Sequence, residues 1–416
     1  TVINPLYEFN NFLSDNSEKK TILHASIFYI KSLYKHITTY HLLLVFFLYR
    51  LLFYVNLHPK TKTLNMNIGI DEVYMQRCLD LAAKACITTI PNPMVGCVIV
   101  YNGRIIGEGF HTKQGCPHAE VHAIDSVKNK QLLKEATLYV NLEPCCHFGK
   151  TPPCTDLIIK HNIPHIVIGT LDVNPCVQNK GVERLKANCA TVKVGVLENE
   201  CKELNKRFFT FHTKKRPYII LKWAQSIDGY MDISPAKREE NTSYWISNET
   251  LKLKVHQWRA QEKAIFVGAN TILRDNPQLN VRYCSGENPT RMTLLNKQLY
   301  NNNFHFFDTK QSTLIFTTFQ TENHDGIHYH VLNKTEDYDK QIMDELYALG
   351  YQSILIEGGK KTLERLIGKN LWDEARVLIG NRYFGEGLKA PTISLFPYKT
   401  ETYDEDKVLY IKNLYS

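Results

Sequence analysis

The chain has 416 residues, of which 44% are hydrophobic and 22% charged, and its formal net charge is +8. This length predicts two or three globular units, and the composition excludes a disordered tail protein, a collagen-like repeat and a disulfide miniprotein. Residues 1–65 hold seven Lys and Arg against three acids, so half of the net charge belongs to this prefix. The remainder is nearly balanced and lacks the basic stripe of a nucleic-acid-binding protein.

The prefix is distinct in another way. Residues 42–57 read LLLVFFLYRLLFYVNL, an apolar run that Arg50 interrupts and that is shorter than the roughly 18 to 20 residues needed to span a bilayer. One interpretation is a membrane-surface anchor flanked by Lys60 and Lys62. The other, which we adopt as the expectation, is that the prefix lies upstream of the true start, because the first methionine is Met66. We therefore expect no membrane association for the enzyme part.

The chain has 11 cysteines, an odd number, and no clear secretory signal. Such usage argues against a disulfide framework and for a reducing compartment. The expected location is the cytoplasm.

Regular elements begin after the prefix. Residues 71–85 have acids at their start and apolar residues at helical spacing, and residues 96–110 are two β-branched runs joined by Asn102-Gly103, a strong hairpin signal. A helix near His118, a strand at 137–142, a helix at 154–161 and a strand at 165–169 follow. This alternation predicts a layered α/β unit with a largely parallel sheet.

One constellation in this unit carries chemistry. His118, Cys145 and Cys154 have the types and number of protein ligands that catalytic zinc takes while leaving one position for water. The H-x-E arrangement places Glu120 two residues after the first ligand, and zinc deaminases combine this pattern with P-C-x-x-C, using the Glu as acid and base. The prediction is hydrolytic deamination of an amidine carbon, with Glu120 moving the proton.

Alternatives stay open at this point. Residues 146–153 (CHFGKTPP) make the spacing between the cysteines longer than in the general pattern, and Cys146 and His147 are competing ligands on spacing alone. The zinc site could also be purely structural, or the cysteines reduced core thiols, although neither has a use for Glu120. The long loop places Lys150 and Thr151 beside the metal.

The same segment resembles the deaminase half of the bifunctional riboflavin-biosynthesis deaminase/reductase family. The resemblance rests on PNPMVGCVIV, GFH, HAE, LEPCCHFGKTPPC and DVNP between residues 91 and 175, and it includes the long cysteine spacing. It implies a cytidine-deaminase-like three-layer fold, zinc on His118, Cys145 and Cys154, and Glu120 as proton donor. It also implies that Asn92, Lys150 and Thr151 bind a phosphorylated pyrimidine. Asn179 stands where the family has glycine, so a left-handed turn is expected there.

A second unit begins at Arg216-Pro217, after a basic and aromatic connector at 205–215. The pattern predicts strands at 218–222, 264–267, 311–317, 353–357 and 375–379 and a helix at 249–259. No G-x-G-x-x-G follows the first strand, so an ordinary Rossmann assignment fails. Gly358-Gly359 precedes a helix whose start, with Lys360 and Lys361, suits a dinucleotide phosphate, although such a turn is more often a plain connection.

This unit resembles the reductase half of the same family, whose fold is dihydrofolate-reductase-like. KWAQSIDG, TSYWIS, GANTILRDNPQLNVR, IEGG and FGEG carry the resemblance, which covers the chain from about residue 71 to its end. The implied NADPH-binding residues are Ala224, Trp245, Thr271, Asp275, Gly359, Lys360, Lys361 and Thr362. The implied substrate-binding residues are Ser243, Leu279, Arg282 and Glu357. The alternative to cofactor binding is that Trp245 is an aromatic residue packed in the core and that Asp275 is a turn residue.

The resulting expectation is an α/β enzyme with a prefix at 1–65, a zinc-dependent pyrimidine deaminase domain at 66–212 and an NADPH-dependent reductase domain at 213–416. Its partner is a small phosphorylated pyrimidine and not a nucleic acid, and it is expected to form a homo-oligomer. Two other classes remain: a nucleic-acid base deaminase with an RNA-binding second unit, and a reductase whose zinc is structural.

Overall fold

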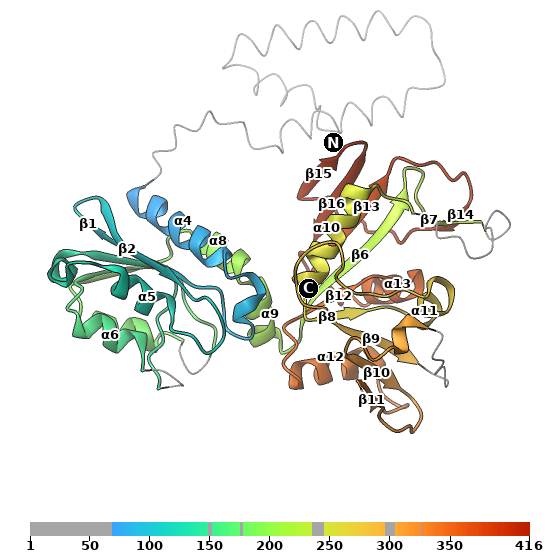
Figure 1. Ribbon diagram of the computed structural model, residues 1–416, viewed down its shortest axis with the longest axis horizontal. Helices are drawn as coiled ribbons and strands as arrows, with labels where there is room; N and C mark the ends of the chain where they lie inside the picture. Colours follow the sequence, from blue (N-terminus) through green and yellow to red (C-terminus); the bar gives the residue numbers. More distant parts are fainter. Residues whose placement is uncertain (1–68, 149–151, 175–177, 235–244, 296–303, 325) are drawn as a thin grey trace, which may run out of the picture. The chain divides into compact units, whose positions relative to one another are not determined.

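The computed structural model describes residues 69–416, apart from 149–151, 175–177, 235–244, 296–303 and 325. The prefix, Lys150, Thr151 and Ser243 therefore lie outside the described residues. The described chain contains a five-stranded sheet, a nine-stranded sheet and a two-stranded ribbon. Figure 1 shows that the first sheet precedes the second along the chain, as the sequence predicts.

The first sheet has the order β2-β1-β3-β4-β5. Its strands are β1 (Gly96–Tyr101), β2 (Arg104–Phe110), β3 (Thr137–Leu142), β4 (His165–Thr170) and β5 (Thr191–Val194). The β1/β2 hairpin turns at Asn102 and Gly103, which both have positive φ as a tight hairpin turn requires. The β1/β2 and β1/β3 pairs are antiparallel, while β3/β4 and β4/β5 are parallel. The sheet is therefore mixed, and the expectation of a largely parallel sheet is wrong for its hairpin half.

Helices cover both faces of this sheet. Alternate residues of β1 point to opposite sides, so Val98 packs with helix α4 (Ile70–Ala83) and Ile99 packs in the core on the opposite face. The second core also contains residues of α5 (Ala119–Ser126), α6 (Cys154–Lys160) and α7 (Lys180–Lys186). The result is the expected three-layer arrangement.

Two helices lead out of this unit. Helix α8 (Glu198–Leu204) contributes Cys201 to the core it shares with α4. Helix α9 (Lys206–Lys214) occupies the segment that the sequence marks as a connector. Asn205 lies between them.

The second sheet has the order β11-β10-β9-β8-β12-β6-β13-β16-β15. Its strands are β6 (Tyr218–Ser226), β8 (Ala264–Phe266), β9 (Thr290–Leu295), β10 (Thr313–Thr317), β11 (Ile327–Val331), β12 (Ser353–Ile356), β13 (Glu374–Gly380), β15 (Lys399–Tyr403) and β16 (Asp406–Lys412). All pairs from β11 to β13 are parallel, and the last two are antiparallel. A separate antiparallel ribbon joins β7 (Tyr230–Ile233) to β14 (Gly387–Lys389).

The central strands of this sheet are apolar on both faces, as strands covered by helices must be. In β6, Ile219 belongs to a core with helices α12 (Tyr338–Ala348) and α13 (Lys360–Gly368). The next residue, Ile220, belongs to a second core that includes helices α10 (Glu249–Ala260) and α11 (Ala269–Asp275). Helices α11 and α13 both begin at the carboxyl ends of parallel strands, where ligands bind in open α/β sheets.

The predicted elements agree closely with these bounds, and β6 is the main exception because it continues four residues beyond the predicted end to Ser226. Within the described part of the chain, no helix has both the length and the apolar character needed to cross a membrane.

Candidate active sites

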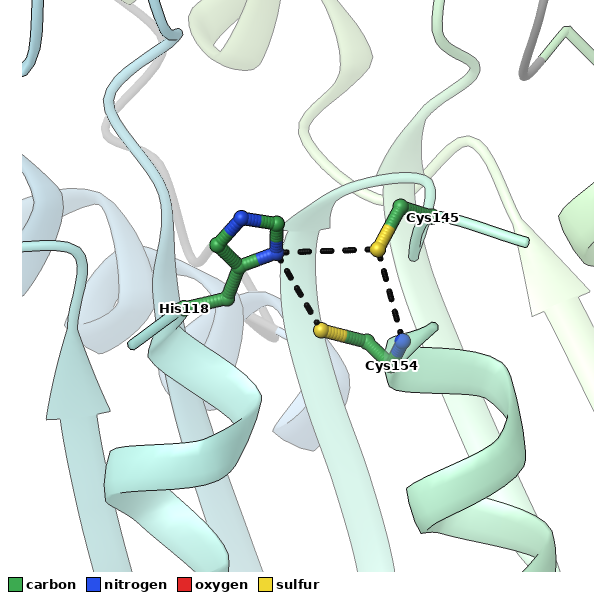
Figure 2. A group of neighbouring side chains, drawn as sticks. All are labelled: His118, Cys145 and Cys154. Carbon is green, nitrogen blue, oxygen red and sulfur yellow. Dashed lines mark hydrogen bonds between the residues drawn. The ribbon is translucent and has the colours of Figure 1, made fainter. Parts of the chain in front are cut away.

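The three predicted metal ligands come together from three elements (Figure 2). His118 precedes α5, Cys145 follows β3, and Cys154 is the first residue of α6. Their ligand atoms all lie within 4.8 Å of one another. His118 Nδ1 is 3.3 Å from Cys154 Sγ and 3.6 Å from Cys145 Sγ, and the Cys154 backbone N–H donates to Cys145 Sγ at 3.3 Å.

The donor set fits zinc. One imidazole nitrogen and two sulfurs are ligands that zinc binds in catalytic sites, where three protein ligands leave a fourth position open. In the described residues, the cluster contains no fourth His, Cys, Asp or Glu ligand. Hydrogen bonds from Cys154 and His118 hold the pKa of Cys145 well below its ordinary value, which favours the thiolate that a metal requires.

Glu120 lies beside this cluster on the first turn of α5 and is buried. Burial and the neighbouring Cys145 raise its pKa, while His118 opposes the shift. A carboxyl with a raised pKa is suited to both accepting and releasing a proton.

The competing ligands do not join the cluster. His147 is exposed, and neither Cys146 nor His147 belongs to the group of converging ligand atoms among the described residues. The structure thus brings together His118, Cys145 and Cys154, the ligand set in which eight residues separate the two cysteines.

Asn92 lies in the loop before β1 and contacts His111 at the end of β2. His111 Nδ1 lies 3.1 Å from the Pro117 carbonyl oxygen, so this nitrogen must be the donor, and Nε2 then accepts from Asn92 Nδ2 at 3.1 Å. Burial lowers the pKa of His111, which favours this neutral form. The His111 and His118 rings lie edge to face with centroids 5.4 Å apart, so Asn92 is near the metal cluster.

The buried Glu143 side chain organises the chain next to Cys145. Glu143, two residues before Cys145, accepts from the backbone N–H groups of Asp172, Asn179 and Val182, each at 3.1 Å. Asn179 has φ 62°, in the left-handed region, as its place in the family pattern predicts. Glu143 therefore ties the loop after β4 to the strand end that carries Cys145.

The second site centres on Glu357, directly after β12. Arg259, at the end of α10, donates from Nε to Oε1 at 2.7 Å and from Nη2 to Oε2 at 2.8 Å. Lys222 from β6 lies 3.4 Å from Oε2. Burial alone would raise the pKa of Glu357, but the charges of Arg259 and Lys222 outweigh it and lower the pKa to about 2.

Two further predicted substrate residues lie in the segment after α11. The Arg282 backbone N–H donates at 3.2 Å to Nδ1 of His256, a buried residue of α10. Arg282 itself has an exposed guanidinium that donates to Asn280 Oδ1 at 2.7 Å. Leu279 is buried with φ 54° and packs in the core below.

The predicted NADPH residues gather partly at the starts of α11 and α13. A Cβ on Gly268, before α11, would lie 2.8 Å from Thr362 Oγ1, and one on Gly359, before α13, would lie 2.9 Å from Thr271 Oγ1. Gly268 N–H also donates to the Gly358 carbonyl at 2.9 Å. A side chain at Gly268 or Gly359 would therefore displace the threonine hydroxyl of the other helix start.

The remaining predicted cofactor residues are more dispersed. Ala224 lies on β6 next to the buried core, Asp275 ends α11, and Lys360 and Lys361 open α13. Trp245 is 44% exposed, and Lys252 Nζ lies 4.1 Å above its ring. It is therefore not a packed core aromatic.

The sequence analysis did not identify Arg259 and His256 as residues of this site, nor Lys222 as a partner of Glu357. A lysine within the apolar strand YIILKWAQS and a glutamate ending ILIE signal buried charges that need partners. Nothing in the sequence indicates which cation meets which carboxylate.

Comparison with known proteins assigns both halves to families. Residues 69–170 match the family model of the cytidine and deoxycytidylate deaminase zinc-binding region. Residues 217–403 match the model of the RibD C-terminal domain.

Full-length relatives give the same result. The chain is 37% identical over 359 residues to the riboflavin biosynthesis protein RibD of Aquifex aeolicus, covering 82% of this chain and 98% of that protein. The RibD of Synechocystis is 35% identical and is covered over 87% of its length, with 77% of this chain aligned.

A solved structure from Thermotoga maritima is described as a diaminohydroxyphosphoribosylaminopyrimidine deaminase/5-amino-6-(5-phosphoribosylamino)uracil reductase. It is 36% identical, with a TM-score of 0.74, and the match covers 83% of this chain and 99% of that one. Acinetobacter baumannii RibD is 29% identical with a TM-score of 0.73, and the match covers 82% of this chain and 98% of that one.

Proposed function

This chain belongs to the RibD family of bifunctional riboflavin-biosynthesis enzymes, and from that premise we propose how its residues divide the two reactions. It has a zinc-binding deaminase half and a reductase half that uses NADPH. The observation that carries the proposal is the convergence of His118, Cys145 and Cys154 beside the buried Glu120.

For the first reaction, we assign the substrate named for the Thermotoga maritima relative, a diaminopyrimidinone that bears a ribosylamino 5′-phosphate. Water displaces its exocyclic amino group as ammonia. His118, Cys145 and Cys154 would hold zinc, which when bound supplies the Lewis acidity that makes water a nucleophile near neutral pH. Glu120 takes the proton from the attacking water and delivers it to the departing amino group.

Asn92 is assigned to the pyrimidine in this site. Its contact with His111 holds its side chain near the metal cluster, which supports this role. The predicted contribution of Lys150 and Thr151 stays a prediction because both lie outside the described residues.

For the second reaction, we propose that the deaminated product is reduced at its ribosyl group to the ribityl form, with NADPH supplying the hydride. Glu357, held as a carboxylate by Arg259 and Lys222, binds the substrate together with Leu279 and Arg282. Ser243, outside the described residues, is expected to join them.

NADPH is assigned to Ala224, Trp245, Thr271, Asp275 and the segment from Gly359 to Thr362. No side chain caps the N-terminus of α13, a place that suits a phosphate, and Lys360 and Lys361 add positive charge. The position of these groups at the carboxyl ends of β8 and β12 supports the assignment.

The test uses the full zinc-loaded chain with the diaminopyrimidine phosphate. We expect ammonia release with or without NADPH, and NADPH oxidation only after deamination. Lack of both activities with zinc bound would contradict the proposal. The homo-oligomer, the cytoplasmic location and the domain boundary at 212/213 stay predictions.

A further inference from the structure

Asn205, at the junction of α8 and α9, does not act as its position predicts. An Asn at a helix N-cap usually accepts a hydrogen bond from a backbone N–H of the first turn. The Asn205 side chain makes no such bond to α9, although it is only 3% exposed. Its polar atoms are committed elsewhere.

Both of those atoms bind the backbone of Met94. The Met94 N–H donates to Asn205 Oδ1 at 2.8 Å, and Asn205 Nδ2 donates to the Met94 carbonyl at 2.9 Å. Buried Asn141 of β3 donates to the same carbonyl at 3.1 Å and accepts from the Gly96 N–H at 2.8 Å. Two side chains therefore hold the backbone of the loop that follows Asn92.

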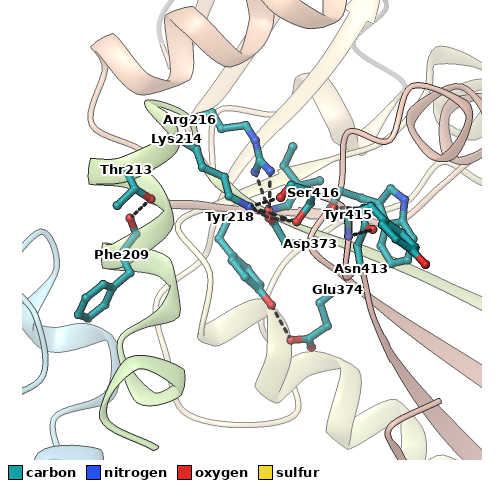
Figure 3. Close-up of polar contacts among 12 residues, drawn as sticks. Phe209, Thr213, Lys214, Arg216, Tyr218, Asp373, Glu374, Asn413, Tyr415 and Ser416 are labelled. Carbon is teal, nitrogen blue, oxygen red and sulfur yellow. Dashed lines mark hydrogen bonds and ion pairs between the residues drawn. The ribbon is translucent and has the colours of Figure 1, made fainter. Parts of the chain in front are cut away.

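The helix that begins after Asn205 is anchored to the reductase half by ion pairs. Lys206 Nζ lies 2.6 Å from Oε2 of Glu374, and Arg207 pairs through two nitrogens with Glu262, whose side chain is fully buried. Figure 3 shows Lys214, the last residue of α9, and Arg216, two residues further along the chain, converging on Asp373. Unpairing buried charges is costly, so these contacts fix α9 firmly.

A second contact reaches the same loop. Gln352, the buried residue before β12, donates from Nε2 to the Pro91 carbonyl at 2.7 Å. Pro91 and Met94 flank the short segment that contains Asn92, so the loop is held on both sides of it.

We propose that Asn205 is a positioning residue for the deaminase reaction. The reductase half fixes α9 and Gln352, these hold the loop at residues 91–94, and the loop places Asn92 against the pyrimidine. Folding of the reductase half is thereby required for tight substrate binding at the zinc site. The inference rests on the proposed function, because it needs Asn92 to contact the substrate.

The test is Asn205→Ala in the full chain. Because loss of two hydrogen bonds releases the loop, KM for deamination should rise about ten-fold. The value of kcat should stay within about two-fold, since Asn92 serves binding and not proton transfer. Zinc content and NADPH oxidation with pre-deaminated substrate should not change. Asn205→Asp keeps an acceptor for the Met94 N–H but sets a buried carboxylate oxygen against the Met94 carbonyl oxygen, so its KM should be at least as high as that of Asn205→Ala.

Gln352→Ala should also raise KM for deamination, but by less than Asn205→Ala, because it removes one hydrogen bond to the loop and not two. The matched control is Asn413→Ala. Asn413 is also buried and bonds to the Trp372 carbonyl, but within the reductase half, so its removal should leave the deamination KM unchanged.

The outcomes separate the two proposals. An active wild type with an unchanged KM in Asn205→Ala overturns the positioning role alone, as does an equal rise in Asn413→Ala. An unchanged KM in Gln352→Ala overturns the role of the Gln352 contact and leaves the ion pairs of α9 as the link from the reductase half. A zinc-loaded wild type that releases no ammonia contradicts the proposed function itself.

Discussion

The deaminase and reductase halves of this enzyme differ in what balances the polar groups of their sites. At the deaminase site, the ligand atoms of a histidine and two cysteines converge within 4.8 Å of one another. At the reductase site, Glu357 is neutralised by Arg259 and Lys222 from the chain itself. The first site is completed by a metal, whereas the second is organised by its own charges.

This difference predicts different sensitivities. A site whose positive charge is a bound ion can lose its function without losing its fold. A site whose charges are built into strands and helices couples function to stability, because removing one partner leaves another buried charge unpaired.

Metal removal should have the largest effect. Chelation should reduce ammonia release below detection, because the remaining residues cannot activate water sufficiently. NADPH oxidation with pre-deaminated substrate should continue at its original rate. Parallel assays of ammonia and NADPH absorbance measure both, and ammonia release that persists in metal-free protein would break the comparison.

Glu120→Gln should come next. Loss of the proton carrier should lower the deamination kcat by about a hundred-fold to ten-thousand-fold, the usual range for general acid–base catalysis. Zinc content, measured by atomic absorption, should equal that of the wild type. Unchanged ammonia release would instead support a zinc site that is only structural.

Glu357→Gln tests the reductase half. The variant leaves Arg259 and Lys222 without their carboxylate, so the free energy of unfolding should fall by about 3 to 5 kcal/mol and NADPH oxidation should be lost with it. The matched control is Glu287→Gln, which breaks the exposed pair with Lys263 and should change stability by no more than about 1 kcal/mol. Urea denaturation measures both, and equal losses would argue against a special role for the buried group.

The smallest expected effect concerns pH. Burial lowers the pKa of His256 to about 4, and the charges of Arg259 and Arg282 add to the shift. Between this value and the ordinary 6.5, the unfolded chain binds more protons than the folded one, so the unfolding free energy should fall as pH falls through this range.

Glu357 behaves differently, because its contribution is present above pH 4.5 and is lost only as the pH falls toward about 2. His256→Asn should therefore flatten the stability curve between pH 6.5 and 4. Denaturation curves across that range measure the slope, and an unchanged slope would show that another group titrates there.

Local patterns predicted much of the fold. The Asn102-Gly103 hairpin, the strand at Thr137–Leu142 and the helix starting at Cys154 all form as expected, because each depends on neighbours in the sequence. The antiparallel pairing of β1 with β3, which makes half of the first sheet antiparallel, was not predicted. Strand order depends on pairing between segments that are distant in the sequence, and the alternation of helices and strands does not indicate which strands pair.

The sequence by itself singled out His118, Cys145, Cys154 and Glu120, since residues of these types in the family's spacing are typical of a zinc deaminase. Only the tertiary structure decided which cations neutralise Glu357 and what Asn205 holds. Arg259 lies 98 residues from Glu357 in the chain, and Asn205 lies 111 residues from Met94. No periodicity or local propensity links positions so far apart, and only packing brings their side chains together.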